Sequence, residues 1–146
     1  MTRLRRTAVA LIAGLVLGVV AGCSQMQPGP LPACVLPGQK PMLVAELFFG
    51  RGIAGRAPLT DAEWAGFAAA VIAHYFPDGF TVTDGEGEWR NPQTHAVARE
   101  RTKVLLVAVE PRPDLGQRFS AVIESYRKRF NQISVGFLTT PACGSF

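Results

Sequence analysis

The sequence has few cysteines, few histidines and few charged residues. Only 3 of the 146 residues are cysteine and 2 are histidine. Neither His74 nor His95 has a second ligand at a metal-binding spacing, so we expect no metal site and no cofactor. Charged residues make up 18% of the chain and hydrophobic residues 48%. This balance is too apolar for a disordered chain, and the length predicts one folded domain, which excludes a multidomain enzyme.

A strong basic patch is also missing. Lys and Arg number 15 against 11 Asp and Glu, but three of the arginines lie among the first six residues, in a segment that we expect to be removed. Their removal leaves 12 basic residues against 11 acidic ones. The largest remaining cluster is Arg127, Lys128 and Arg129, which is too small for a phosphate-binding footprint. We therefore expect no nucleic-acid partner.

No apolar run is long enough to span a bilayer. The longest extends from Ala8 to Ala21, follows three arginines and has the length of a signal-peptide core. It ends in Val20-Ala21-Gly22-Cys23, which resembles the lipobox of bacterial lipoproteins. We expect residues 1–22 to be a lipoprotein signal peptide and Cys23 to carry acyl chains such as palmitate. The protein is then anchored in the cell envelope, on the periplasmic side of the outer membrane or the outer face of the cytoplasmic membrane. The alternative is a plain secretory leader with a chance cysteine.

Residues 23–41 predict a flexible tether after the lipidated cysteine, because they are rich in Gln, Pro and Gly. The folded domain is then expected over residues 42–146. Cys34 and Cys143 are the remaining cysteines, and in an oxidising compartment we expect them to form a disulfide. Free thiols or intermolecular pairing are the alternatives.

The folded part shows four strand patterns and two helix patterns. Strands are expected over 42–49, 80–90, 95–110 and 134–140. Thr60 and Glu63 have the spacing of a capping box, which predicts a helix that ends before Pro77. A second helix, with apolar residues on one face over 115–130, is expected to be capped by Asp114. This order predicts an α+β fold of the ferredoxin-like (split βαβ) type, with a four-stranded antiparallel sheet and both helices on one face.

Several short segments carry a family resemblance from about Leu43 to the C-terminus. They are Glu46-Leu47-Phe48-Phe49-Gly50, Glu63-Trp64, Phe76-Pro77-Asp78-Gly79-Phe80-Thr81-Val82, Gly87-Glu88-Trp89-Arg90 and Arg99-Glu100-Arg101-Thr102-Lys103-Val104. In this combination the chain resembles an uncharacterised family of small bacterial secreted lipoproteins, domain of unknown function thirty-five seventy-four. The resemblance implies export and one compact domain, and it implies no activity.

The hairpin over residues 80–110 holds the first part of a candidate polar site. A turn about Pro92 and Gln93 would place Glu86 opposite Arg99 and Asp84 opposite Arg101. One interpretation is a ladder of ion pairs on a solvated face. The other is a site in which the two arginines bind a carboxylate or phosphate.

The sheet face away from the helices is expected to be apolar, because both alternating sets of residues in the first and third strands are apolar. The tether, a second copy of the chain, a partner or an apolar ligand could cover it. Glu46 and Lys103 complete the candidate polar site, and we expect them near one another on this face, more as a structural pair than as a catalytic one.

These patterns favour a lipid-anchored envelope protein whose domain is a binding or assembly module, with a homodimer through the open sheet face or another envelope protein as partner. The alternative is a small dimeric α+β-barrel-type enzyme or small-molecule binder with a pocket on that face, in which Glu46, Arg99, Arg101 or Lys103 supplies acid, base or anion-binding groups. A purely structural lipoprotein is a third possibility. Whether the protein is an enzyme stays open.

Overall fold

The computed structural model describes residues 34–146. The expected signal peptide, Cys23 and most of the expected tether lie outside the described residues. The elements follow in the order β1 (Lys40–Gly50), α1 (Asp61–Phe67), η1 (Ala68–Ile72), α2 (Ala73–Tyr75), β2 (Thr81–Arg90), β3 (Val97–Val109), α3 (Leu115–Phe130) and β4 (Gly136–Gly144). Each predicted strand and helix is present, with ends shifted by a few residues.

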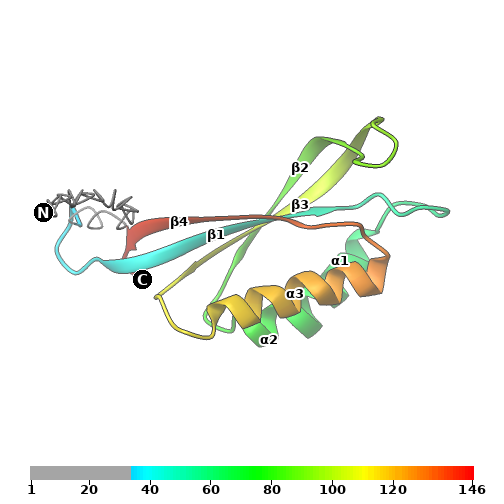
Figure 1. Cartoon of the computed structure of the whole chain (residues 1–146). Helices are drawn as coiled ribbons and strands as arrows, with labels where there is room; N and C mark the ends of the chain where they lie inside the picture. The colour runs from blue at the N-terminus through cyan, green and yellow to red at the C-terminus, as the bar shows by residue number, and fades with distance from the viewer. Residues whose placement is uncertain (1–33) are drawn as a thin grey trace, which may run out of the picture. The chain divides into compact units, whose positions relative to one another are not determined.

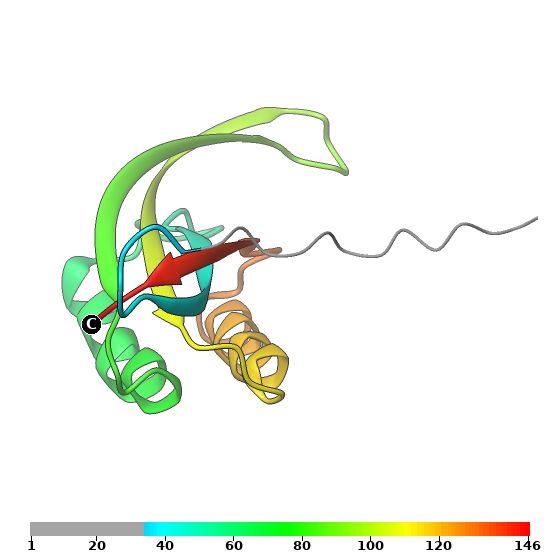
Figure 2. The ribbon, with the colours of Figure 1, turned by 90° about the vertical axis from the view of Figure 1, so that its left-hand side faces the viewer.

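The four strands form one antiparallel sheet in the order β2-β3-β1-β4. Both helical segments lie on the same side of it (Figure 1). This arrangement confirms the predicted ferredoxin-like α+β fold. The β2–β3 hairpin is longer than the rest of the sheet and curls over the side away from the helices (Figure 2).

The first helix begins at the predicted capping box. The hydroxyl of Thr60 accepts a hydrogen bond from the backbone N–H of Glu63 at 3.2 Å, and the Glu63 carboxylate accepts one from the backbone N–H of Thr60 at 2.8 Å. The helix then widens into the π-helical turn η1, where the N–H of Ala73 donates to the carbonyl of Ala68. This wide turn allows Phe67 and Ile72, five residues apart, to be completely buried.

Asp114 is the N-cap residue of α3, at the predicted position, but its side chain makes no cap hydrogen bond. Its carboxylate instead accepts a hydrogen bond from Nε of Arg118 at 2.8 Å. Asn131, in the left-handed conformation at φ 51°, ends the helix.

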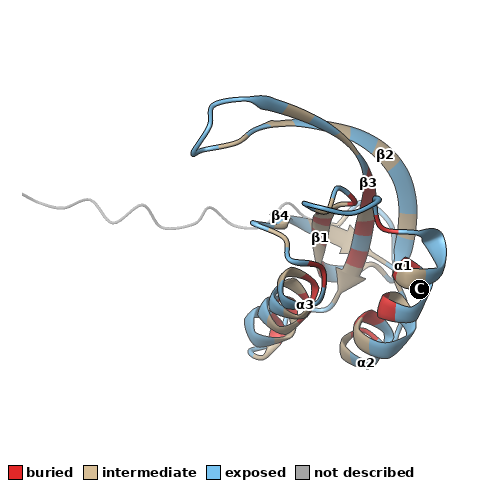
Figure 3. Cartoon of the chain, turned by 90° about the vertical axis from the view of Figure 1, so that its right-hand side faces the viewer, coloured by how far each residue is buried: buried red, intermediate tan, exposed pale blue. Residues whose placement is uncertain are grey.

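The hydrophobic core lies between the sheet and the helices (Figure 3). Its centre is an aromatic cluster in which the rings of Phe49 and Tyr126 are 4.7 Å apart and those of Phe67 and Tyr126 are 5.2 Å apart. The hydroxyl of buried Tyr126 donates to the carbonyl of Gly50 at 2.8 Å. This bond ties α3 to the end of β1.

The predicted register of the hairpin is wrong by two residues. Glu86 lies opposite Arg101, and Asp84 lies opposite Lys103. The loop between the strands extends over 91–96 and is longer than expected, because Asn91 Oδ1 accepts from the N–H groups of Gln93 and Thr94. His95 then turns the chain with a positive φ of 58°.

Candidate functional site: the open face of the sheet

The sheet has one face against the helices and one face without them. Ala45, Leu47 and Phe49 of β1 are completely buried in the core. Because side chains alternate along a strand, their neighbours in β1 point to the opposite side. Residues directly opposite on paired strands share a face, which adds residues from β3 and β4. We call this surface the open face; it comprises Val44, Glu46, Phe48, Val104, Leu106 and Leu138.

The open face is apolar and accessible, in agreement with the alternation of the sequence. Leu106 is 38% exposed and Leu138 is 59% exposed. Val44, Phe48 and Val104 are half-buried. The β2–β3 hairpin bends over this side of the sheet (Figures 2 and 3), so the surface is overhung by the hairpin.

Glu46 is the one charged member of the open face. It lies directly opposite Leu106 on β3 and Leu138 on β4. The side chain is half-buried and makes no hydrogen bond or ion pair with any residue of 34–146. The predicted proximity of Glu46 and Lys103 is wrong, because Lys103 lies opposite Phe49 and therefore points to the helix side.

Lys103 instead belongs to a four-residue ion cluster on the helix side. Its Nζ lies 2.7 Å from Oδ1 of Asp84 and 3.0 Å from Oδ1 of Asp61. Arg51 Nη1 lies 3.0 Å from the same Asp61 oxygen and 3.8 Å from Asp84 Oδ1. Lys103 and Arg51 are only 7% and 5% exposed, so both cations are buried beneath exposed carboxylates. The sequence analysis found Asp84 and Lys103 but missed Arg51 and Asp61.

The electrostatics of this cluster indicate a structural role. The hydrogen bond from Lys103 and the charge of Arg51 lower the pKa of Asp61. The hydrogen bond to Asp84 raises the pKa of Lys103, so the amine stays protonated and cannot act as a base or nucleophile. Arg51 also donates from Nε to the carbonyl of Leu59 at 2.7 Å. The cluster therefore joins the 51–60 loop and the start of α1 to the base of the hairpin.

The remaining predicted polar residues lie on the outer surface of the hairpin. Glu86 faces Arg101, and Arg99 Nε lies 2.6 Å from Oε1 of Glu88. These residues share the side of Lys103 and not that of Glu46, since no bulge interrupts the register. They line a hollow of about 300 Å³ together with Gly87 and Glu100. On the outer surface the carboxylates of Glu86 and Glu88 match the two guanidinium groups in number, and Glu88 is already paired with Arg99, which disfavours an anion site.

Glu100 is a second residue that the sequence analysis did not single out. It points to the concave side of the hairpin and accepts a hydrogen bond from the N–H of Gly52 at 2.6 Å. A Cβ atom at Gly50 would lie 2.7 Å from the Glu100 carboxyl carbon. Glycine at position 50 therefore allows the carboxylate to approach the end of β1 closely.

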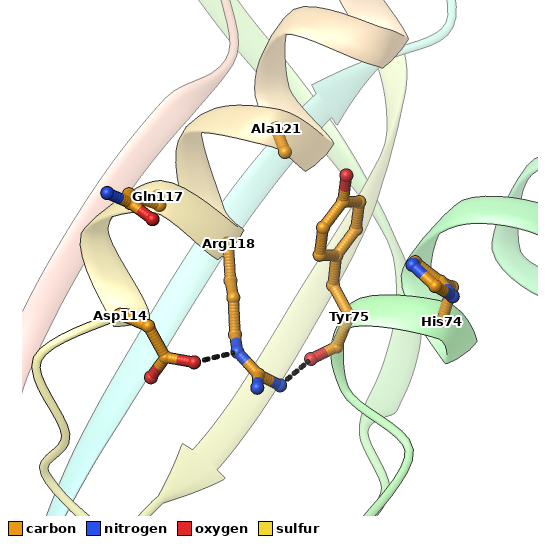
Figure 4. Close-up of a pocket in the computed structure, with 6 residues that line it drawn as sticks. All are labelled: His74, Tyr75, Asp114, Gln117, Arg118 and Ala121. Atoms are coloured by element: carbon orange, nitrogen blue, oxygen red, sulfur yellow. Dashed lines mark hydrogen bonds and ion pairs between the residues drawn. The ribbon is translucent and has the colours of Figure 1, made fainter.

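A further hollow, of about 480 Å³, lies between α2 and α3 (Figure 4). Arg118 crosses it and donates from Nη1 to the carbonyl of Tyr75 at 2.8 Å and from Nε to Asp114. The hydrogen bond from Arg118 lowers the pKa of Asp114. Because these charges already hold the two helices together, this hollow is a weaker candidate than the open face.

The predicted disulfide between Cys34 and Cys143 is confirmed, with the Cα atoms 5.6 Å apart. Within residues 34–146 no group of three or more His, Cys, Asp or Glu side chains is arranged to hold a metal ion. No helix in this part of the chain is long and apolar enough to cross a membrane.

Comparison with known proteins identifies a family and a fold. The family model described as "Protein of unknown function (DUF3574)" matches residues 44–146. No curated protein matches the chain. A phage SAM lyase in complex with S-methyl-5'-thioadenosine is similar in structure, with a TM-score of 0.58, 12% identity and coverage of 80% of this chain and 97% of the lyase.

Two further solved structures are similar. The phage SAM lyase in its apo state has a TM-score of 0.54 and 14% identity, and the match covers 73% of this chain and 84% of that one. CutA from Synechococcus elongatus PCC7942 has a TM-score of 0.47 and 13% identity, with coverage of 76% and 84%. At these identities the two lyase structures support the fold alone.

Proposed function

The chain belongs to the DUF3574 family of proteins of unknown function, and we propose that it is an exported lipoprotein whose ferredoxin-like domain is a binding module. The arginines and apolar core of the leader, and the lipobox that ends at Cys23, support this proposal. Lipid on Cys23 holds the domain at the bacterial cell envelope, on the periplasmic side of the outer membrane or the outer face of the cytoplasmic membrane.

The observation that carries the binding role is that the Glu46 carboxylate, within the apolar open face, has no hydrogen-bond or ion-pair partner among residues 34–146. Exposed Leu106 and Leu138 flank it directly. Apolar surface favours an apolar ligand, and a carboxylate that is partly removed from water is stabilised by a nearby positive charge. We infer that the ligand is a small organic cation with an apolar body, whose positive group pairs with Glu46.

A second copy packed sheet to sheet suits this face less well. A two-fold interface centred on the open face would bring two Glu46 carboxylates into one apolar contact, with no cation of this face between them. A small cation instead neutralises the carboxylate. Acid–base catalysis by the predicted polar residues acting together is also disfavoured. Glu46 lies on the opposite side of the sheet from Arg99, Arg101 and Lys103.

The fold likeness gives limited support to a small ligand. The similar phage SAM lyase is described in complex with S-methyl-5'-thioadenosine. That molecule is an uncharged thioether, whereas SAM carries a positive charge at sulfur together with an added aminocarboxypropyl group. The comparison of wild type with Glu46→Gln, and not the ligand pair alone, therefore isolates the effect of the Glu46 charge. We use them as probes of charge recognition.

The test is calorimetric titration of the full chain, purified in detergent, with SAM and with S-methyl-5'-thioadenosine. We expect SAM to bind more tightly than the thioether. Glu46→Gln should weaken SAM binding about tenfold or more, because a charge-assisted contact of about 1.4 kcal/mol or more is lost. The affinity for the thioether should change little.

Glu86→Gln is the matched control, since it removes the same charge from the outer surface of the hairpin and should leave both affinities unchanged. Equal SAM affinities of the wild-type chain and the Glu46 variant, or no binding of SAM at all, would contradict the proposal.

A further inference from the structure

The two edge strands of the sheet differ sharply in charge. Within residues 34–146, β2 and β4 are the edges of the sheet, because the strand order is β2-β3-β1-β4. β2 carries Asp84, Glu86, Glu88 and Arg90 within its ten residues, whereas the nine residues of β4 include no charged side chain. Charged side chains on an edge strand oppose pairing with another chain. Only β2 has this protection.

β4 also exposes apolar side chains on both of its faces. Leu138 is 59% exposed on the open-face side. Phe137, on the helix side, stacks on Phe119 with ring centroids 5.0 Å apart and is still 42% exposed. Ile133, just before the strand, is 51% exposed. A ligand on one face cannot cover this set, but a strand beside β4 can, because its side chains also alternate between the two faces.

We propose that a second copy of this chain pairs its β4 antiparallel along the β4 edge, across a two-fold axis. β4 suits itself as a partner because symmetric pairing places no like charges side by side. It places Leu138 of each copy opposite Leu138 of the other on one face, and Phe137 opposite Thr139 on the other face, so apolar side chains meet on both faces of the contact. The charged β2 edge offers no such partner.

The contact is limited to the first part of β4. Pro141 has no N–H to donate, and Cys143 is joined to Cys34 by the disulfide. We therefore place the pairing over residues 136–140. This contact is independent of the proposed ligand site, since it uses backbone groups at the edge and does not require Glu46.

The test is the mass of the full chain, purified in density-matched detergent, by sedimentation equilibrium. The wild-type chain should be a dimer. Thr139→Lys should be a monomer, because it places two ammonium groups beside the symmetric contact. Thr83→Lys is the control, because it makes the same change at an exposed threonine of the other edge strand, β2. The Thr83→Lys chain should remain a dimer.

Hydrogen exchange provides a second measurement that does not depend on a variant. Amides of residues 136–140 should exchange several-fold faster when the wild-type chain is diluted below its dimer range, whereas amides of β2 should not change. A monomeric wild-type chain, a dimeric Thr139 variant that keeps its circular dichroism spectrum, or exchange independent of concentration would overturn the proposal. None of these results depends on SAM binding.

Discussion

At the scale of single residues, the structure separates side chains that are chemically alike. Glu46 and Glu100 both lie on strands of the sheet, but Glu100 accepts a hydrogen bond from Gly52 and Glu46 has no partner within residues 34–146. Lys103 is buried, yet two carboxylates satisfy its charge. The proposed ligand-binding role of Glu46 therefore rests on its missing partner as much as on its residue type.

Tyr126 shows how a single polar atom can stabilise the core. Burial raises the pKa of its phenol, so the hydroxyl stays protonated and donates to Gly50. We expect Tyr126→Phe to lower the free energy of unfolding by about 1 to 2 kcal/mol, because the Gly50 carbonyl loses its donor. Urea denaturation of the full chain measures this change.

Tyr75→Phe is the control for that measurement, because the Tyr75 hydroxyl makes no hydrogen bond within the described residues. It should change the free energy of unfolding by less than about 0.5 kcal/mol. Equal losses in both variants would show that the bond to Gly50 contributes nothing.

At the scale of elements, a local sequence signal sets where helix α1 begins, whereas packing against the sheet sets how the next turn is wound. The capping box starts α1 at the predicted residue because its hydrogen bonds extend over only three residues. The π-helical turn η1 was not predicted, since a 3.6-residue period describes the same apolar residues almost as well. Packing against the sheet favours the wider turn, which buries Phe67 and Ile72 together.

The capping box also predicts a pH dependence. Hydrogen bonds from Arg56 and from the backbone and hydroxyl of Thr60 lower the pKa of Glu63 from 4.5 to about 2. A lowered carboxyl pKa stabilises the fold fully above pH 4.5, and this contribution is lost as the pH falls to about 2. The wild-type chain should therefore be more stable than Glu63→Gln at neutral pH, and the difference should shrink through that window.

Thermal unfolding of both chains between pH 7 and pH 2 measures the difference. Glu124→Gln on α3 controls for the loss of one surface carboxylate. A difference between wild type and Glu63→Gln that stays constant down to pH 2 would contradict the assignment.

At the scale of the whole molecule, the domain places different chemistry on different surfaces. The helix side holds the aromatic core and the Lys103 cluster, while the open face holds Glu46 among apolar residues. The disulfide joins residue 34 to β4, and so connects the segment that follows the expected lipid anchor to the sheet.

The anchor itself is a prediction about the whole molecule. We expect the wild-type chain, expressed in bacteria with labelled palmitate, to carry the label and to begin at Cys23 by intact mass. Cys23→Ser should lose the label completely, because the thiol is the acyl acceptor. Ser24→Ala, the adjacent control, should keep it. Label that persists in the Cys23 variant, or a mature chain that begins elsewhere, would exclude the lipoprotein assignment.

The sequence by itself determined the order of elements, the ferredoxin-like fold and the pairing of Cys34 with Cys143. These follow from local periodicity, from turn residues and from the small number of cysteines, and none of them depends on exact register. Only the tertiary structure decided which charges meet. A loop two residues longer than expected moved Lys103 opposite Asp84. Strand pairing placed Glu46 and Lys103 on opposite sides of the sheet, because Glu46 lies opposite Leu106 and Lys103 lies opposite Phe49. The sequence alone does not reveal which residues of two strands lie opposite one another.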